Sequence, residues 1–288
     1  MPLIDAHTHA YPKTERHLVV ERVELLDGHL PPDSPSKWRL HLDGSIESLI
    51  EAEQKAGFDG LVLLPISGRP KGCSRLNQWV AEKAGRYPQI IPFACLTPLS
   101  PNPEQDLAEA LSLGLKGIKI HSVLQRIIPL QAQTLEWLEM IQASGLPILM
   151  DAMNLKGIRE RKPHMAQILD QWAPFETSPK VIRVIAKTFP KIQIIAAHLG
   201  CLYGWDQIEE LLGLENVCFD LSFAQEILPL EEIKKIISRK GVEHILFGSD
   251  TPWRHPAEAW RRFLELKLSS EAVEKISGGN LEELLKLG

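Results

Sequence analysis

Short apolar runs alternate with amphipathic segments along the whole chain. Eight runs of strand length lie at residues 2–9, 59–66, 90–97, 115–121, 146–152, 192–198, 216–222 and 244–250. Helical periodicity follows at 45–57, 74–86, 103–113, 131–144, 178–189, 204–213, 230–240 and 256–267, with a last segment at 271–286. Such alternation is typical of repeated βα units and a parallel sheet. Eight units on 288 residues predict a single-domain α/β protein, a (β/α)8 TIM barrel, rather than an open sheet.

The segment from residue 10 to residue 44 interrupts this regular pattern. It is too long for a plain connection after the first strand, and it contains Pro31, Pro32 and Pro35. We therefore expect one barrel domain over residues 1–288, with 10–44 as a loop insertion that covers the mouth.

Composition narrows the range of partners and compartments. The formal net charge is −5 and the basic residues are scattered, which argues against nucleic acid or an anionic membrane as a partner. The four cysteines are far apart and form no CxxC pair, which fits a reducing compartment. No apolar run reaches the 18 residues that a membrane span needs. We expect a cytoplasmic protein that acts on a small-molecule substrate, with a homodimer left open.

Polar side chains gather where the predicted strands end. Active sites of these barrels are built at the carboxyl ends of the strands. The residues concerned are Asp5, His7 and His9 on the first strand, Lys119 and His121 on the fourth, Asp151 on the fifth, His198 on the sixth, Asp220 and Ser222 on the seventh, and Asp250 on the eighth. Asp5 lies one step deeper and is expected to be a structural hydrogen-bond acceptor.

His7 and His9 form an HxH pair on the first strand. Residues two apart on a strand point to the same side, so both imidazoles can bind one ion at about 2.0 to 2.1 Å. With His198 and Asp250 ending other strands, the pattern indicates a site for one divalent metal ion, Zn²⁺ or Mn²⁺.

The order of motifs resembles the amidohydrolase superfamily, and within it the amidohydrolase 2 group of TIM-barrel hydrolases and aromatic-acid decarboxylases. The matching segments are DAHTH (5–9), FACLTPL (93–99), GLKGIKIH (114–121), AAHLG (196–200), LFGSDTPW (246–253) and GGNLEELL (278–285). The resemblance implies that His7 and His9 bind the metal and that Asp250 binds it weakly while handling protons. It also implies that His198 is a catalytic group or a further ligand.

The fifth strand departs from that group. Family members usually place a metal-binding histidine where this chain has Asp151. Asp151 could be an oxygen ligand of the metal, or it could orient a histidine. It could also mark a member that works with little or no metal.

Other side chains are candidates for binding substrate. Lys119 and His121 share one face of the fourth strand and could hold a carboxylate of the substrate or of Asp151. Arg69 and Arg126 follow strand ends and could clamp an anionic substrate, and Trp253 could form a wall of the pocket.

The leading functional expectation is hydrolysis of a C–N or C–O bond, in an amide, lactone or ester of a small carboxylated molecule, by metal-activated water. The first alternative is non-oxidative decarboxylation of an aromatic or related acid, against which Asp151 weighs slightly. The second is a barrel that binds a ligand without turnover. A TatD-like nuclease is disfavoured, because the fourth strand lacks the glutamate of such enzymes and the surface is not basic.

Overall fold

Among the described residues, nine short parallel strands form the centre of the molecule. The computed structural model describes residues 1–27, 30 and 38–287, except for the side chains of residues 22 and 25. The strands are β1 (Ile4–Thr8), β2 (Gly60–Leu63), β3 (Ile90–Pro92), β4 (Ala94–Cys95), β5 (Ile118–Ile120), β6 (Ile148–Met150), β7 (Ile194–Ala196), β8 (Val217–Asp220) and β9 (Ile245–Leu246). β1 to β3 pair in sequence order, and so do β4 to β9.

The strands close into a barrel, as the sequence predicts. The predicted third strand, 90–97, is divided into β3, which pairs with β2, and β4, which pairs with β5. Between these halves, the N–H of Phe93 donates to Leu63 O at 3.2 Å. At the other seam, the N–H of Ala6 donates to Phe247 O at 2.9 Å, and the N–H of Asp250 donates to the carbonyl of His7 at 2.8 Å. The eight predicted strand positions therefore form one closed (β/α)8 barrel.

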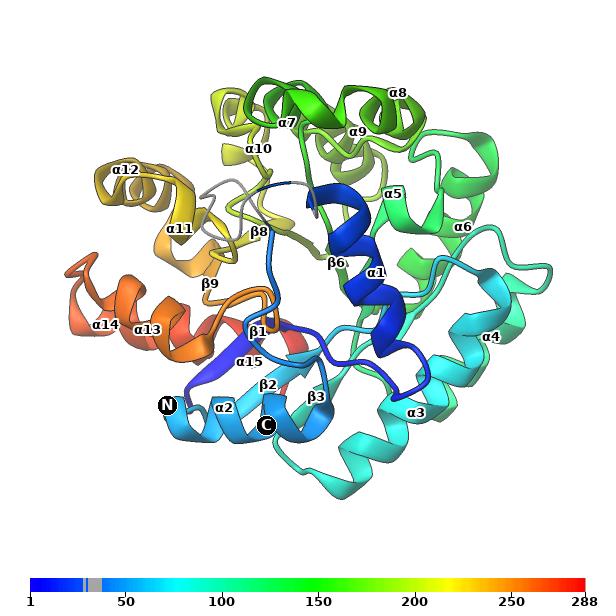
Figure 1. Ribbon diagram of the computed structural model, residues 1–288, viewed down its shortest axis with the longest axis horizontal. Helices are drawn as coiled ribbons and strands as arrows, with labels where there is room; N and C mark the ends of the chain where they lie inside the picture. Colours follow the sequence, from blue (N-terminus) through cyan, green and yellow to red (C-terminus); the bar gives the residue numbers. More distant parts are fainter. Residues whose placement is uncertain (28–29, 31–37, 288) are drawn as a thin grey trace.

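Helices surround the strands as an outer ring (Figure 1). The helices are α1 (Arg16–Asp27), α2 (Ile46–Ala56), α3 (Cys73–Arg86), α4 (Pro103–Ser112), α5 (Ser122–Gln125), α6 (Ala132–Ser144), α7 (Leu155–Arg161), α8 (Ala166–Trp172), α9 (Pro179–Thr188), α10 (Glu209–Leu212), α11 (Ala224–Ile227), α12 (Leu230–Lys240), α13 (Pro256–Leu264), α14 (Ser270–Glu274) and α15 (Asn280–Leu285). No helix of the described residues is long and apolar enough to cross a bilayer.

The predicted last helix, 271–286, is wrong as a single element. It is split into α14, a π-helical segment at Lys275–Gly279, and α15. At Gly278 the chain passes so close to the start of β1 that a Cβ atom would lie 2.0 Å from the carbonyl oxygen of Pro2. The C-terminal helices thus pack directly beneath the strand that carries His7 and His9.

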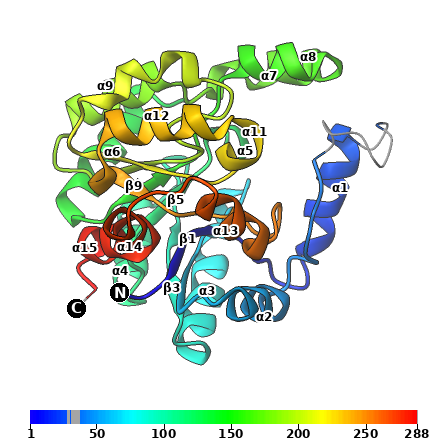
Figure 2. The same ribbon diagram turned by 90° about the vertical axis from the view of Figure 1, so that its left-hand side faces the viewer.

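Three helices of seven or more residues at the mouth of the barrel were not predicted from the sequence, and neither were the four-residue helices α5 and α11. α1 lies within the 10–44 segment, and α7 and α8 follow β6. Both groups stand at the same end of the barrel in the side view of Figure 2. Residues 28–29 and 31–37, which include Pro31, Pro32 and Pro35, lie outside the described residues.

A buried ion pair joins these two groups of helices. Nζ of Lys162, after α7, donates to Oδ2 of Asp27, the last residue of α1, at 2.6 Å. Asp27 also accepts from the N–H of Trp38 at 2.8 Å, and its Oδ1 lies 3.0 Å from Nε2 of His164. The Lys162 ammonium packs over the Trp38 ring, 4.3 Å from its centroid. Asp27 therefore anchors the end of α1 to the segment that follows β6.

Candidate metal centre and active site

His7 lies in β1 and His9 directly follows this strand, and the Nε2 atoms of the two rings are 3.2 Å apart. His9 Nδ1 lies 2.8 Å from Leu64 O. Because a carbonyl oxygen only accepts, Nδ1 carries the proton and Nε2 offers a lone pair. Burial and the nearby Lys119 ammonium lower the pKa of His7 to about 4, in spite of the carboxylates beside it, so the His7 ring is neutral at pH 7. Two imidazoles whose Nε2 atoms face each other form a pair of candidate ligands that suits a cation.

Asp220 and Ser222 at the end of β8 fix the His7 ring. Asp220 Oδ2 lies 2.9 Å from His7 Nδ1, and Ser222 Oγ lies 3.1 Å from the same atom. Burial alone would raise the pKa of Asp220, but its contacts with His7, His198 and Ser222 lower it. A carboxylate at Nδ1 holds the proton there and leaves His7 Nε2 free to bind a metal.

Asp250 completes a group of three ligands. Its Oδ1 lies 3.6 Å from His7 Nε2 and 3.4 Å from His9 Nε2, and the ligand atoms of the three side chains all lie within 4.8 Å of one another. Burial alone would raise the pKa of Asp250, but the surrounding histidines lower it below its ordinary value. Two imidazole nitrogens and a carboxylate oxygen fit a divalent metal such as Zn²⁺ or Mn²⁺.

Asp250 and His198 lie in loops, beyond the strands on which the sequence placed them. β7 and β9 end at Ala196 and Leu246. Both residues have left-handed backbone conformations, with φ of 67° at Asp250 and 62° at His198. Such strain in non-glycine residues is kept where the surrounding structure enforces it, often at functional sites.

A second cluster of charged side chains lies beside the three ligands, around Asp151. Asp151 Oδ2 lies 3.4 Å from Nζ of the fully buried Lys119 and 3.9 Å from His121 Nε2. Its Oδ1 lies 3.5 Å from His198 Nε2. Burial alone would raise the pKa of Asp151, but these three cationic or titratable neighbours lower it well below its ordinary value. Lys119 Nζ also lies 3.2 Å from His7 Nε2, so it connects the two clusters.

His198 is the group in this cluster best suited to carry a proton. Its Nδ1 lies 2.9 Å from Ser222 Oγ, and its Nε2 faces Asp151. Burial disfavours the charged ring, but the carboxylates of Asp151, Asp250 and Asp220 outweigh this effect and raise the pKa of His198 to about 9. In the metal-free protein His198 is therefore protonated at neutral pH.

A cavity of about 130 Å³ lies above both clusters. Its polar lining consists of His9, His121, Asp151, His198 and Asp250. The remaining lining is apolar or aromatic: Tyr11, Val23, Leu26, Trp38, Ile66, Val123, Leu124, Met153, Trp172, Leu202, Phe223 and Trp253. Four of these residues, Tyr11, Val23, Leu26 and Trp38, come from the 10–44 segment. The cavity thus has a charged floor and apolar walls.

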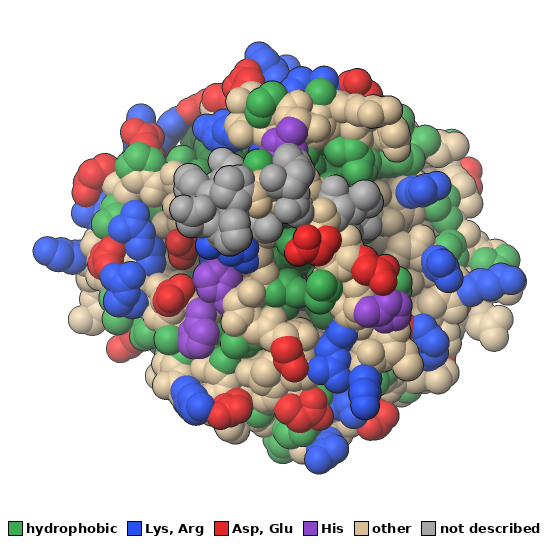
Figure 3. Space-filling model, in the orientation of Figure 1, with side chains coloured by type: hydrophobic (Ala, Val, Ile, Leu, Met, Phe, Trp, Pro, Cys, Tyr) green, Lys and Arg blue, Asp and Glu red, His purple; other side chains and the backbone are tan. Residues whose placement is uncertain are grey.

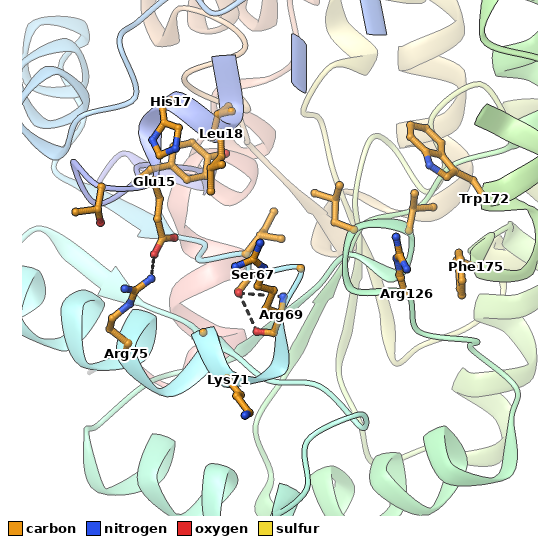
Figure 4. Close-up of a pocket in the computed structure, with 18 of the residues that line it drawn as sticks. Glu15, His17, Leu18, Ser67, Arg69, Lys71, Arg75, Arg126, Trp172 and Phe175 are labelled. Atoms are coloured by element: carbon orange, nitrogen blue, oxygen red, sulfur yellow. Dashed lines mark hydrogen bonds and ion pairs between the residues drawn. The ribbon is translucent and has the colours of Figure 1, made fainter. Parts of the chain in front are cut away.

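The other candidate substrate residues lie at different depths. Trp253 lines this cavity and also the wider groove outside it. Lys119 is buried beneath the floor, whereas Arg69 and Arg126 line only the outer groove (Figure 4).

Sequence reasoning identified Asp220 and Ser222 as polar strand-end residues but gave them no role. The signal available in the sequence was that Asp220 and Ser222 are two residues apart on the predicted seventh strand and so point to the same side. Their contacts with His7 and His198 depend on β8 lying between β7 and β9, which only the closed barrel reveals. The expectation for Asp5 is confirmed, because its Oδ1 accepts from the N–H groups of His7 and Ser249 at 3.0 Å each.

Comparisons with known proteins agree with the fold and with the motifs. The amidohydrolase family model matches residues 4–287, so the chain belongs to this family of enzymes. No curated protein matches the chain in sequence.

Solved structures match over nearly the whole chain at low identity. A 2,6-dihydroxybenzoate decarboxylase solved with 2,6-dihydroxybenzoate has 16% identity and a TM-score of 0.70, with 99% of each chain covered. A variant of a 5-carboxyvanillate decarboxylase from Novosphingobium aromaticivorans, solved with bound manganese, has 15% identity and a TM-score of 0.72, with 99% of this chain and 97% of that chain covered. A candidate 2-pyrone-4,6-dicarboxylic acid hydrolase from Pseudomonas putida has 16% identity and a TM-score of 0.64, with the same coverage.

Proposed function

We propose that this protein is a metal-dependent decarboxylase of a small aromatic carboxylic acid. The observation that carries the proposal is the cavity above the metal ligands, with apolar walls and a charged floor in a volume of about 130 Å³. An apolar cavity of roughly 150 Å³ holds a benzene ring, so this one suits a single aromatic ring.

The walls and the floor favour different parts of such a substrate. Trp38, Trp172, Phe223 and Trp253 offer flat apolar surfaces against which a ring can pack. The charged floor would hold the polar groups of the substrate, while the apolar walls enclose its ring.

His198 is placed to complete the reaction. When the bond between the ring carbon and the carboxyl carbon breaks, its electron pair stays on the ring carbon and CO₂ leaves. That carbon must then accept a proton, and His198 Nε2 lies in the cavity lining beside Asp151. We assign proton delivery to His198 and the support of its charged form to Asp151.

His7, His9 and Asp250 would hold the metal, for which we propose manganese or zinc. The ion would stabilise negative charge on the substrate oxygens as a Lewis acid. Lys119 and His121 would place further positive charge beneath and beside the same oxygens.

The names of the similar structures support decarboxylation over the hydrolysis that the sequence favours. Two of the three described above are decarboxylases of hydroxylated aromatic acids, and one was solved with manganese. Asp151 weighed against this branch in the sequence, but its contacts with Lys119, His121 and His198 give it a role that decarboxylation can use.

Hydrolysis remains the second candidate function because one carboxylate oxygen of Asp151 could serve as a base. Asp151 Oδ1 is buried and makes no hydrogen bond among the described residues, although His198 Nε2 lies 3.5 Å away, so it could accept a proton from an attacking water. One similar structure is a candidate hydrolase of a cyclic ester.

An isotope experiment separates the two reactions. Manganese-loaded protein is incubated in D₂O with ¹³C-carboxyl hydroxybenzoates and, separately, with aromatic lactones and esters, and the products are followed by NMR. We expect labelled CO₂ and one deuterium on the ring carbon, with turnover abolished in His198→Asn. Ring opening of the lactones without CO₂ release would instead establish the hydrolase.

A further inference from the structure

A groove of about 1330 Å³ adjoins the small cavity. Both are lined by Tyr11, Ile66, Val123, Leu124, Trp172 and Trp253, so one opens into the other. The groove is about ten times larger than the cavity, and it exceeds the 300 to 1,000 Å³ of an ordinary small-molecule site. A single aromatic acid would leave it empty.

The groove concentrates positive charge in an acidic protein. The described residues that line it include Arg69, Lys71, Arg75 and Arg126, but only one carboxylate, Glu15. The chain as a whole has a net charge of −5. On the face seen in Figure 3, acidic and basic side chains are interspersed, so the excess of cations belongs to the groove and not to the whole face.

Two of these arginines have no acidic partner among the described residues. Arg75 is paired with Glu15, which accounts for the one carboxylate. Arg69 and Arg126 make no ion pair with any described carboxylate, and both side chains are exposed to solvent. Figure 4 shows them entering the groove from different elements, with Trp172 and Phe175 near Arg126.

The backbone holds both arginines in place. Arg69 is fixed by Ser67, whose hydroxyl donates to the Arg69 carbonyl at 3.0 Å and accepts from the Arg69 N–H at 3.2 Å. Arg126 ends α5 in a left-handed conformation with φ of 57°, and its N–H donates to Ser122 O. Each guanidinium is thus presented from a short, hydrogen-bonded turn.

We propose that the groove is a second anion subsite, and that the substrate is an aromatic acid carrying a carboxylate or phosphate on an arm that reaches Arg69 and Arg126. The ring and the reacting carboxyl group occupy the small cavity, and the arm runs past Trp172 and Trp253 into the groove. Only the placement of the ring and the reacting carboxyl group in the small cavity rests on the proposed function. The guanidinium groups bind the terminal anion, and the aromatic side chains cover the arm.

Equilibrium binding tests this proposal without requiring turnover. Manganese-loaded protein is titrated by calorimetry with para-pentylbenzoate, with its para-(ω-carboxybutyl) counterpart, and with the phosphonate in place of that terminal carboxylate. The corresponding meta compounds are titrated in parallel. The variants are Arg69→Gln/Arg126→Gln and the matched control Arg86→Gln, which removes an exposed arginine of α3 outside the groove.

We expect the terminal anion to improve affinity about tenfold at low ionic strength in at least one series, with less gain at high salt. The double variant should lose this gain and still bind pentylbenzoate, and Arg86→Gln should keep it. The better of the carboxylate and the phosphonate identifies the anion. Equal affinities of charged and uncharged arms in both series, or a gain that survives in the double variant, would overturn the subsite. If simple hydroxybenzoates are decarboxylated but the terminal anion does not improve affinity, the subsite is refuted and the proposed reaction stands. If the terminal anion improves affinity but no hydroxybenzoate is decarboxylated, the reaction is refuted and the subsite stands.

Discussion

Oδ2 of Asp220 lies 2.9 Å from Nδ1 of His7, on the side of the ring opposite the metal ligands. This contact fixes the tautomer in which Nε2 offers its lone pair to an ion. A buried carboxylate at the end of β8 thereby orients a candidate metal ligand on β1.

Replacing Asp220 should therefore weaken metal binding without removing a ligand. We expect Asp220→Asn to lower metal affinity about 10- to 100-fold, because an amide no longer holds the proton on Nδ1. Competition with a fluorescent chelator measures the affinity, and thermal melting reports whether the variant is folded. Asp206→Asn, an exposed change in the 3₁₀ helix η4 (Trp205–Gln207), is the matched control. Unchanged affinity in a folded Asp220→Asn protein would rule out this role.

Asp151→Asn tests what Asp151 contributes. Because Asp151 is paired with Lys119, His121 and His198 and is not one of the three grouped ligands, we expect the metal content to be unchanged. Turnover should fall at least about a hundredfold, since His198 loses the carboxylate that favours its protonated form. Elemental analysis and a turnover assay on the same preparation measure both quantities. If the metal is lost as well, Asp151 is a ligand.

The pair of Asp27 and Lys162 should make stability depend on acid pH. Burial alone would raise the pKa of Asp27, but Lys162, Trp38 and His164 lower it below 3.8. A carboxylate whose pKa is lowered by folding stabilises the fold above its ordinary pKa, and this contribution is lost as pH falls through the folded value.

Asp27→Asn should accordingly cost about 3 kcal/mol of unfolding free energy near neutral pH, because the variant loses the buried carboxylate that Nζ of Lys162 contacts at 2.6 Å. Urea unfolding at several pH values measures the difference between the two proteins. That difference should shrink below pH 3.8. A difference that is the same at pH 7 and pH 3 would contradict the ion-pair account.

The sequence predicted most of the fold because its signals are periodic. The apolar runs marked every strand position, and helical periodicity marked the helices between them. Four of these helices end at or next to a glycine with φ between 72° and 94°: Gly57, Gly114, Gly145 and Gly241. Helices α1, α7 and α8 and the four-residue helices α5 and α11 were not predicted, because they belong to irregular segments after the strands and have no place in the repeated βα pattern.

The grouping of His7, His9 and Asp250 could be predicted for a similar reason. His7 and His9 are two apart on one strand, and Asp250 follows another strand of the same barrel, so topology alone brings them together. The depth of other side chains could not be predicted. Lys119 and Arg126 are only seven residues apart in the chain, yet Lys119 is fully buried while Arg126 is exposed in the outer groove. That difference depends on how β5 turns into α5.

The metal content of the purified protein tests the central claim most directly. The protein is loaded with manganese or zinc, freed of loosely bound ions by gel filtration, and analysed by elemental mass spectrometry beside His7→Ala/His9→Ala. We expect about one ion per wild-type chain and almost none in the folded double variant. An active wild-type protein without metal, or equal metal content in the two proteins, would contradict a metal centre at His7, His9 and Asp250.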